Sequence, residues 1–297
     1  MSFTVDVVIP TFNRSRQLKR LLDQLISYDD PALRRIIVVD NASNDDTSEV
    51  LKKCGDRVEV IRKPINVLSA GARQAGWEIA TADFVCFIDD DNILGSNLFS
   101  ELGEFIASDP SIGLVAPLQY RFDDGTVWCT GGVISELARA SYTVDLSCLE
   151  VERNFDFQPN VFMARRSLIS KGIDFDWKRF PHNWSEAEFG YRIKDAGYTI
   201  RTCTTAVVYH DIDYGGVFTR LNERNAEDQA RSRIVYRRLY ANRIAVWVWF
   251  VLVVMPGSSF LLGIETIKKR RSWRILWRYA IGTWEGFRES VTLSRTS

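Results

Sequence analysis

The sequence predicts an α/β fold in which a mostly parallel sheet carries helices on both faces, followed by a helical tail. Short apolar runs rich in β-branched residues alternate with longer amphipathic segments through residues 1–110. This alternation is typical of parallel strands joined by crossover helices. The hydrophobic content of 46% is that of a globular protein with a substantial core.

The first expected strand is Val5–Ile9, which Pro10 ends. We expect Ser15 to cap a helix over residues 17–28, whose leucines fall on one face. The other strands expected in this half cover residues 36–39, 58–62 and 84–88, and the other helices cover 47–53, 68–79 and 97–107. Residues 206–209 form a later strand-like run, and residues 111–160 are expected to form the mixed part of the sheet.

The strand expected at 84–88 stops abruptly at three consecutive carboxylates, Asp89, Asp90 and Asp91. Adjacent carboxylates repel one another unless a positive group lies between them. A hard divalent cation with oxygen ligands, which usually also holds a phosphate, meets this need. The run therefore indicates a metal–diphosphate site, and the alternative is a solvated acidic turn.

Three polar clusters, at residues 10–14, 40–43 and 89–91, each follow an expected strand. Parallel strands place their carboxyl ends at one edge of the sheet, so the clusters are expected to meet in one crevice. The sequence contains neither GxGxxG nor GxxxxGK[ST], which disfavours a dinucleotide dehydrogenase and a P-loop ATPase.

Without a glycine cradle, basic side chains must help to neutralise the phosphates. Arg14 and Arg73 are the candidates, unless they are ordinary surface arginines. Asp40 either accepts hydrogen bonds from a nucleotide base or serves as a turn aspartate.

Four segments in order resemble the nucleotide-sugar-binding half of family 2 glycosyltransferases, which have the GT-A fold. They are VIPTFNR at 8–14, VVDNASNDDT at 38–47, Asn66 with SAGAR at 69–73, and IDDDN at 88–92. The resemblance covers residues 5–215. It implies a glycosyltransferase domain over 1–230, with the nucleotide sugar bound by residues 1–110 and the acceptor by 111–230.

The resemblance also assigns residues to the donor. Pro10, Thr11, Asn13 and Asp40 would hold the base and ribose. Arg73 would lie near the diphosphate, Asp89 would meet the ribose or sugar, and Asp91 would meet the metal. The whole set expected at the nucleotide sugar is Pro10, Thr11, Asn13, Arg14, Asp40, Asn66, Gly71, Arg73, Asp89 and Asp90.

Glu186 and Glu188 lie near the start of an expected helix, where the helix dipole favours carboxylates. Glycosyl transfer needs a general base for the acceptor hydroxyl, and a carboxylate can be that base. The family pattern Glu-Asp-x-Asp-Leu-x-x-Arg, aligned on Arg192, places Glu186 on the base position. Here Glu replaces Asp and Ser185 replaces Glu, so Glu188 remains the alternative base.

His210 follows the strand-like run at 206–209 and is one of only two histidines. Its imidazole can complete the coordination of Mn²⁺ or Mg²⁺ begun by Asp91, and in the resembled family a histidine after a late strand often does so. The alternative is a structural histidine. Asn160, Trp184 and Glu188 are expected on the acceptor side, although core packing is an alternative for the tryptophan.

The tail differs in charge from the rest of the chain. Residues 231–297 contain 13 Lys and Arg against 3 Asp and Glu, a net of +10, which leaves a net of −10 for residues 1–230. Residues 244–264 carry no charge, and as a helix they would span roughly 30 Å, the thickness of a bilayer core. However, residues 256–259 interrupt this run, and basic clusters flank both of its ends. A hairpin or an interfacial segment is favoured over a simple span.

We therefore expect the tail to attach the protein to an anionic membrane surface through residues 244–288. The aromatic residues expected at the headgroups are Trp247, Trp249, Trp273, Trp277, Tyr279 and Trp284. The alternatives are a helix packed on the catalytic domain or across a homo-oligomer. Five scattered cysteines and a start without a basic, apolar leader indicate the cytoplasmic face.

Together these features predict a metal-dependent, inverting glycosyltransferase. Its donor would be a nucleoside-diphosphate sugar and its acceptor a hydroxyl of a lipid-linked or surface glycan, with no nucleic acid involved. The alternative is a non-catalytic nucleotide-sugar-binding or scaffold protein at the membrane. A nucleotidyltransferase is disfavoured because no glycine-rich triphosphate loop is present.

Overall fold

The computed structural model describes residues 3–135, 140–147, 153–211, 225–240, 247–248, 250–268 and 273–293. The chain forms two compact units. The first comprises residues 1–133, 142–181 and 185–212, and the second comprises residues 134–141, 182–184 and 213–297. The domain boundary after residue 230, inferred from charge, stays a prediction.

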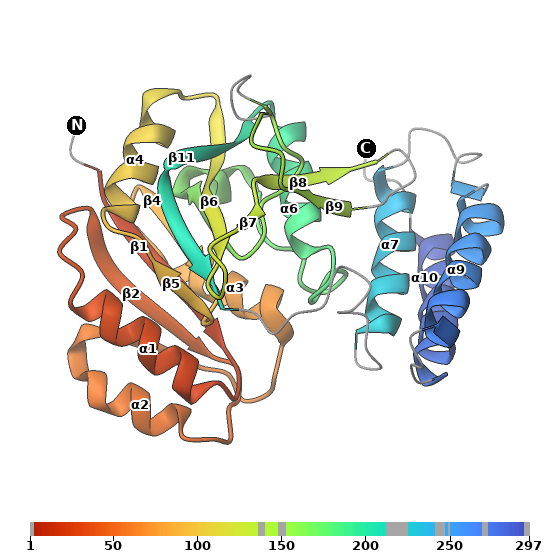
Figure 1. Ribbon diagram of the computed structural model, residues 1–297, viewed down its shortest axis with the longest axis horizontal. Helices are drawn as coiled ribbons and strands as arrows, with labels where there is room; N and C mark the ends of the chain where they lie inside the picture. Colours follow the sequence, from red (N-terminus) through yellow and green to blue (C-terminus); the bar gives the residue numbers. More distant parts are fainter. Residues whose placement is uncertain are drawn as a thin grey trace. The chain divides into compact units, whose positions relative to one another are not determined.

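A nine-stranded sheet organises the first unit, with strands in the order β3-β2-β1-β4-β10-β6-β11-β5 and with β7 paired to β6 (Figure 1). The strands are β1 (Val5–Thr11), β2 (Leu33–Asp40), β3 (Glu59–Arg62), β4 (Phe84–Ile88), β5 (Asn92–Leu94), β6 (Ile112–Arg121), β7 (Val127–Cys129), β10 (Val161–Arg165) and β11 (Thr199–His210). Strands β3, β2, β1 and β4 are parallel, as predicted. Strand β10 is antiparallel to β4 and β6, and so introduces the mixed half.

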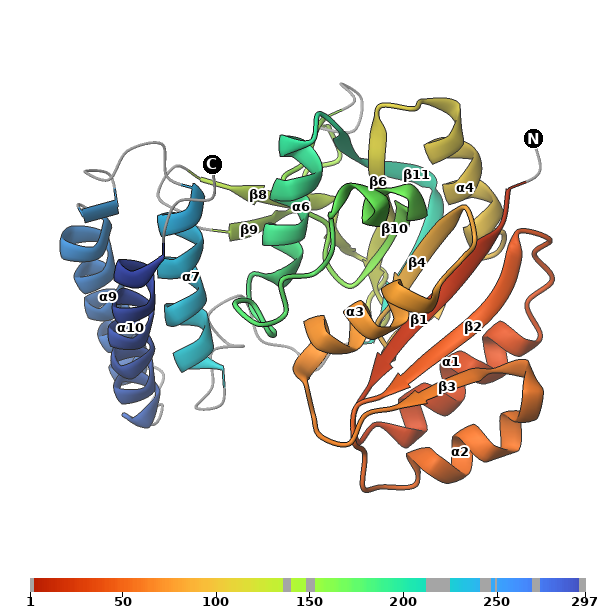
Figure 2. The ribbon, with the colours of Figure 1, turned by 180° about the vertical axis from the view of Figure 1, so that it is seen from behind.

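Helices cover both faces of this sheet. They are α1 (Ser15–Ile26), α2 (Thr47–Cys54), α3 (Leu68–Ile79), α4 (Leu98–Ser108) and α6 (Ser185–Asp195). The core on one face joins side chains of α1, α2 and α4 to alternate residues of β1, β2 and β4. The core on the other face is formed with α3 and α6, which lie in front of the sheet in Figure 2. Because side chains alternate along each strand, the runs buried on both faces read as continuous apolar segments.

The expected helix cap is wrong in one detail. Ser15 is the first residue of α1, and Arg14, which precedes it, makes no capping hydrogen bond through its side chain. Instead the Ser15 amide donates to Asp45 Oδ2 at 3.0 Å, from the loop before α2. A carboxylate distant in sequence therefore satisfies this helix start, which local sequence cannot reveal.

Several short elements lie between these helices and strands along the chain. The 3-10 helices η1 (Gly55–Arg57) and η2 (Arg166–Lys171) follow α2 and β10. Strands β8 (Gly131–Ile134) and β9 (Ala140–Thr143) form a separate two-stranded sheet.

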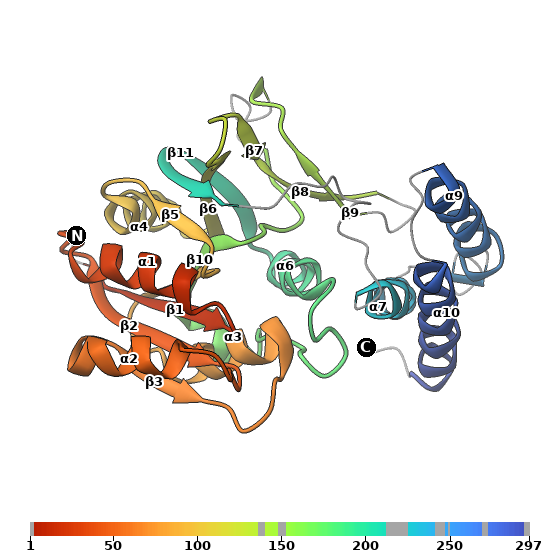
Figure 3. The same cartoon turned by 60° about the horizontal axis from the view of Figure 1, so that its bottom comes forward.

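The second unit contains α7 (Ala226–Tyr240), the π-helical turn η3 (Phe250–Val254), α9 (Met255–Lys268) and α10 (Arg274–Thr292). Helices α7 and α10 lie side by side within it (Figure 3). Their backbones approach closely at Gly282, where an added Cβ would lie 1.9 Å from the Glu227 carbonyl oxygen. Pro256 falls in the first turn of α9, where proline is tolerated, and the π-helical turn η3 directly precedes this helix, so the uncharged run does not form one regular α-helix.

Two observations in the structure bear on the membrane attachment expected for the tail. No helix within the described residues is both long enough and apolar enough to cross a membrane. Trp247 and Tyr279 are buried, so their expected place at the headgroups is wrong, whereas Trp273, Trp277 and Trp284 are exposed. Trp249 and the basic residues at 243 and 269–271 lie outside the described residues.

Candidate active site

The carboxyl ends of β1 and β4 meet through direct side-chain contacts. The Thr11 hydroxyl donates to Asp90 Oδ2 at 2.7 Å, joining the first polar cluster to the third. Arg14 lies between two carboxylates, with its guanidinium 3.1 Å from Asp90 and 2.7 Å from Asp91. Arg14 thus places a positive charge beside two of the three adjacent carboxylates.

The two carboxylates beside Arg14 differ in electrostatic environment. Burial raises the pKa of Asp90 to about 7, although Arg14 and the Thr11 hydroxyl oppose this. Burial also acts against ionisation of Asp91, but His210 and Arg14 outweigh it and lower its pKa to about 2. Asp91 is therefore ionised across the neutral pH range, whereas Asp90 titrates within it.

The second polar cluster is held by its own network. Asp40 is buried, accepts the Ser43 amide at 2.9 Å, and forms an ion pair with Arg62 from the end of β3. Asn13 has the left-handed φ of 53° and accepts the Asn44 amide at 2.8 Å. Arg62 carries no local signal in the sequence that marks it as a site residue, and only the parallel register of β2 and β3 places it opposite Asp40.

Asn66 and Gly71 lie around the start of α3. The Asn41 side chain donates to Asn66 Oδ1 at 2.8 Å and accepts the Val67 amide at the same distance. Gly71 is buried, and an added Cβ would lie 2.8 Å from the Val67 side chain and 3.4 Å from the Trp177 ring. These contacts fix the turn that leads from β3 into α3.

Arg73 occupies the centre of the site. Its side chain is 1% exposed, and its guanidinium donates to Asp89 Oδ1 at 2.7 Å and to Glu186 Oε1. The Phe162 ring of β10 lies 5.8 Å from the same guanidinium. A single arginine therefore joins the carboxylate that follows β4 to the first turn of α6, 113 residues along the chain.

The two glutamates of α6 have different surroundings. Burial opposes ionisation of Glu186, but Arg73 and the Ser185 hydroxyl lower its pKa below the ordinary value. The Glu186 side chain is 22% exposed, whereas that of Glu188 is 2% exposed and lies 3.7 Å from Arg192 on its own helix. Glu186 is the more accessible carboxylate of the two, and its lowered pKa keeps it ionised at neutral pH.

Antiparallel pairing of β11 with β5 brings His210 opposite Asn92 and next to Asp91. His210 Nε2 lies 3.3 Å from Asp91 Oδ1, and the Trp128 ring packs edge-on against the imidazole at 4.5 Å. The buried Nδ1 of His210 has no hydrogen-bond partner among the described residues. A carboxylate and an imidazole this close fit two ligands of one divalent ion. The part of the chain that the structure describes contains no cluster of three or more His, Cys, Asp or Glu residues able to hold a metal.

Asn160 and Trp184 are both largely buried. Asn160, with a φ of 66°, donates to Asn92 Oδ1 at 2.7 Å and to Gln119 Oε1 at 3.3 Å, and its carbonyl accepts the Asp89 amide. It thereby holds the loop that carries the three aspartates. Trp184 belongs to the second unit, where its ring lies 4.9 Å from that of Tyr236, a core-packing contact.

Residues 6–172 match the sequence model of the protein family Glycosyl transferase family 2. A pre-mycofactocin glycosyltransferase of Mycobacterium tuberculosis is 28% identical over 213 residues, which cover 70% of this chain and 42% of that protein. A GalNAc(5)-diNAcBac-PP-undecaprenol beta-1,3-glucosyltransferase of Campylobacter jejuni is 34% identical over 102 residues, 33% of each chain. This chain thus spans less than half the length of either relative.

A crystal structure of GalNAc-T7 with UDP, GalNAc and Mn²⁺ has a similar fold. Its TM-score to this chain is 0.64 at 16% sequence identity, and the match covers 87% of this chain and 57% of the other. At this identity the likeness concerns the fold alone. It agrees with the GT-A architecture expected from the sequence.

Proposed function

The chain belongs to glycosyl transferase family 2, and from this premise we propose that it transfers a sugar from a nucleoside-diphosphate donor to an acceptor hydroxyl, with inversion at the anomeric carbon. The observation that carries the proposal is Glu186, which Arg73 keeps ionised at the start of α6. In a single displacement one base removes the hydroxyl proton while the acceptor oxygen attacks from the face opposite the leaving diphosphate. That geometry inverts the anomeric carbon.

The donor in this proposal lies along the carboxyl edge of β1, β2 and β4. Pro10, Thr11, Asn13 and Asp40 contact its base and ribose, and Asn66 and Gly71 shape the turn beside it. Asp89 contacts the ribose or sugar. Arg14 is the cation available to the phosphates, because its side chain is 48% exposed, whereas that of Arg73 is buried.

We assign Asp91 and His210 as the protein ligands of a divalent ion, Mn²⁺ or Mg²⁺. Their 3.3 Å separation and the ionised state of Asp91 support this assignment. Such an ion, when bound, neutralises negative charge on the leaving nucleoside diphosphate. With two protein ligands, its remaining positions would belong to diphosphate oxygens and water. GalNAc-T7, one of the neighbours of known structure, was crystallised with UDP, GalNAc and Mn²⁺.

Glu186 is our choice for the general base over Glu188. The Glu188 side chain is 2% exposed, so an acceptor hydroxyl has little access to it. Glu186 is one methylene longer than the aspartate usual at this position of the family. Because a misplacement of ~1 Å can cost ~10²-fold in rate, Arg73 has a positioning role in holding this longer side chain.

A lipid-linked or surface glycan is the acceptor that we propose, at the cytoplasmic face of a membrane. The name of the Campylobacter jejuni relative describes an undecaprenol-linked glycan acceptor. The net charge of +10 over residues 231–297 suits an anionic lipid surface. In this proposal residues 1–230 form the catalytic domain and residues 231–297 form the membrane-associating tail.

A donor panel tests the proposal. The assay measures release of nucleoside diphosphate from UDP-, GDP- and dTDP-sugars with Mn²⁺ or Mg²⁺, using membrane lipid extract as acceptor. We expect metal-dependent release with one donor, and its loss in Glu186→Gln and in Asp91→Asn. Glu104→Gln is the matched control, because it makes the same substitution at an exposed position of α4.

The panel also has outcomes that contradict the proposal. Donor binding by calorimetry without release under any condition would favour the non-catalytic binding protein. Activity that survives Glu186→Gln but not Glu188→Gln would move the base to Glu188. Release of pyrophosphate in place of nucleoside diphosphate would indicate a nucleotidyltransferase.

A further inference from the structure

Helix α10 has one face that is packed within the second unit. Its buried residues are Ile275, Tyr279, Gly282, Gly286 and Ser290. The glycines on this face allow the backbone of α10 to approach that of α7. The internal packing of α10 is thus complete on this side, and its other residues are not needed for contact with α7.

The opposite face of α10 exposes large apolar side chains. Trp273, which immediately precedes the helix, is 62% exposed, Trp277 is 69%, Trp284 is 60% and Val291 is 59%. Their spacings of 4, 7 and 7 residues place them along one side of the helix, and we call these four residues the Trp stripe. A row of exposed large apolar side chains along one helix face is typical of an interaction site.

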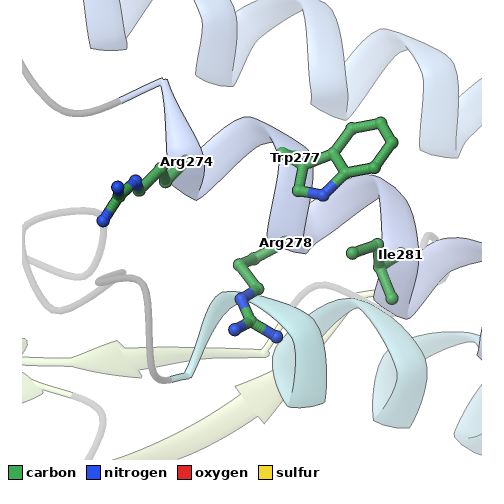
Figure 4. Close-up of a pocket in the computed structure, with 4 residues that line it drawn as sticks. All are labelled: Arg274, Trp277, Arg278 and Ile281. Atoms are coloured by element: carbon green, nitrogen blue, oxygen red, sulfur yellow. The ribbon is translucent and has the colours of Figure 1, made fainter.

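Arginines border the Trp stripe. Arg274, Trp277, Arg278 and Ile281 line a hollow of about 370 Å³ on α10 (Figure 4). Arg278 forms an ion pair with Glu227 of α7 at 2.8 Å, and its side chain is still 53% exposed. Tryptophan beside arginine matches the two layers of a membrane interface, since the indole settles at the headgroup level and the guanidinium meets lipid phosphate.

The charge of the tail favours a lipid partner over a second copy of the chain. Residues 231–297 carry a net charge of +10, so two copies of this surface would repel each other, whereas an anionic bilayer attracts each of them. We propose that the Trp stripe, with Arg274 and Arg278 beside it, is the surface through which this protein docks on an anionic phospholipid bilayer. The mode is peripheral, with α10 lying in the interface.

Vesicle flotation of the full chain tests the inference and does not depend on glycosyl transfer. We expect the protein to float with vesicles of phosphatidylglycerol and phosphatidylcholine, and less as salt is raised. The Trp277→Ala/Trp284→Ala double variant should lower the partition coefficient at least about tenfold, from lost apolar burial. Arg274→Gln should lower it about fivefold, the loss of ~1 kcal/mol of attraction.

A matched control replaces an exposed aromatic residue elsewhere. Phe122→Ala removes a ring that is 51% exposed in the first unit, and it should float like the wild type. Brominated phosphatidylglycerol should quench the tryptophan fluorescence of the wild type and quench the double variant much less. Circular dichroism melting curves of the variants are expected to match the wild type, because the replaced side chains are exposed.

Three results would overturn the inference. The first is no flotation and no quenching with the anionic vesicles. The second is a double variant that partitions like the wild type, which would place the contact elsewhere. The third is a wild-type dimer in sedimentation that the double variant abolishes, since a second copy would then cover the Trp stripe.

Discussion

Replacing Arg73 by Gln should separate the two roles that the structure gives this residue. Its buried guanidinium bonds to Asp89 and Glu186 at once, so the substitution leaves two carboxylates without their shared cation. Removing one partner of a buried ion pair typically costs about 3–5 kcal/mol of stability. The same change frees the Glu186 side chain, and displacement of a catalytic group by ~1 Å costs ~10²-fold in rate.

The direction of the pH effect follows from the pKa of Glu186. Burial opposes its ionisation, and the guanidinium of Arg73 is what lowers the pKa below the ordinary value. Without Arg73, only the Ser185 hydroxyl and a backbone hydrogen bond still oppose the effect of burial, and the pKa rises. The acid limb of the kcat/KM profile of Arg73→Gln should therefore lie at higher pH than that of the wild type. Arg73→Lys keeps the charge but lacks the planar fork that reaches both carboxylates, so it should restore only part of the shift.

The assay is nucleoside diphosphate release across pH 5–9, together with urea unfolding of each variant. Arg165→Gln is the matched control. Arg165 is a half-buried arginine of the same unit, but its guanidinium donates to the backbone carbonyls of Ile112 and Asp109, at 2.7 and 2.8 Å, and not to a carboxylate. It should lose stability without moving the acid limb. An acid limb that stays in place in Arg73→Gln, or that moves equally in Arg165→Gln, would refute the reasoning.

Three further predictions concern a buried carboxylate, the proposed metal ligands and a helix contact. Burial disfavours the ionised form of Asp6, but hydrogen bonds from Arg35 and from two backbone amides outweigh burial and lower the pKa of Asp6. Asp6→Asn should therefore lower the free energy of unfolding, measured in urea at pH 7, by about 2–3 kcal/mol. The stability that ionised Asp6 contributes is present at pH values above its ordinary pKa of 3.8, and it is lost as the pH falls below that value. Asp91→Asn should weaken Mn²⁺ binding measured by calorimetry with UDP by at least about tenfold. Gly282→Ala should lower the melting temperature, because its Cβ would lie 1.9 Å from a backbone oxygen and overpacking costs about 1–3 kcal/mol.

Each of these predictions has its own control. The stability difference between Asp6→Asn and the wild type should shrink at pH 3, and a constant difference would contradict the linkage argument. Glu104→Gln should bind Mn²⁺ as the wild type does. Gly263→Ala places a methyl group 4.0 Å from its nearest neighbour, so it should not lower the melting temperature, and equal losses at both glycines would point to helix propensity instead.

The local pattern of the sequence was sufficient to predict the parallel strands of the sheet and the edge of the sheet at which the site lies. Residues 84–88 read as a buried strand followed by carboxylates, and β4 has those bounds. The alanine- and glycine-rich segment at 68–79 was likewise expected to be helical, and α3 has those bounds. These features are visible because strand and helix periods, and the rule that parallel strands end at one edge, depend on neighbours along the chain.

Tertiary structure alone decided which charged groups meet. Arg73 contacts Glu186 across 113 residues, and the Asp45 carboxylate, from a distant loop, accepts the amide of Ser15 at the start of α1. Among the tail aromatics, composition could not separate buried Trp247 from exposed Trp277. Such choices depend on strand register, helix rotation and long-range packing, which sequence periodicity does not specify.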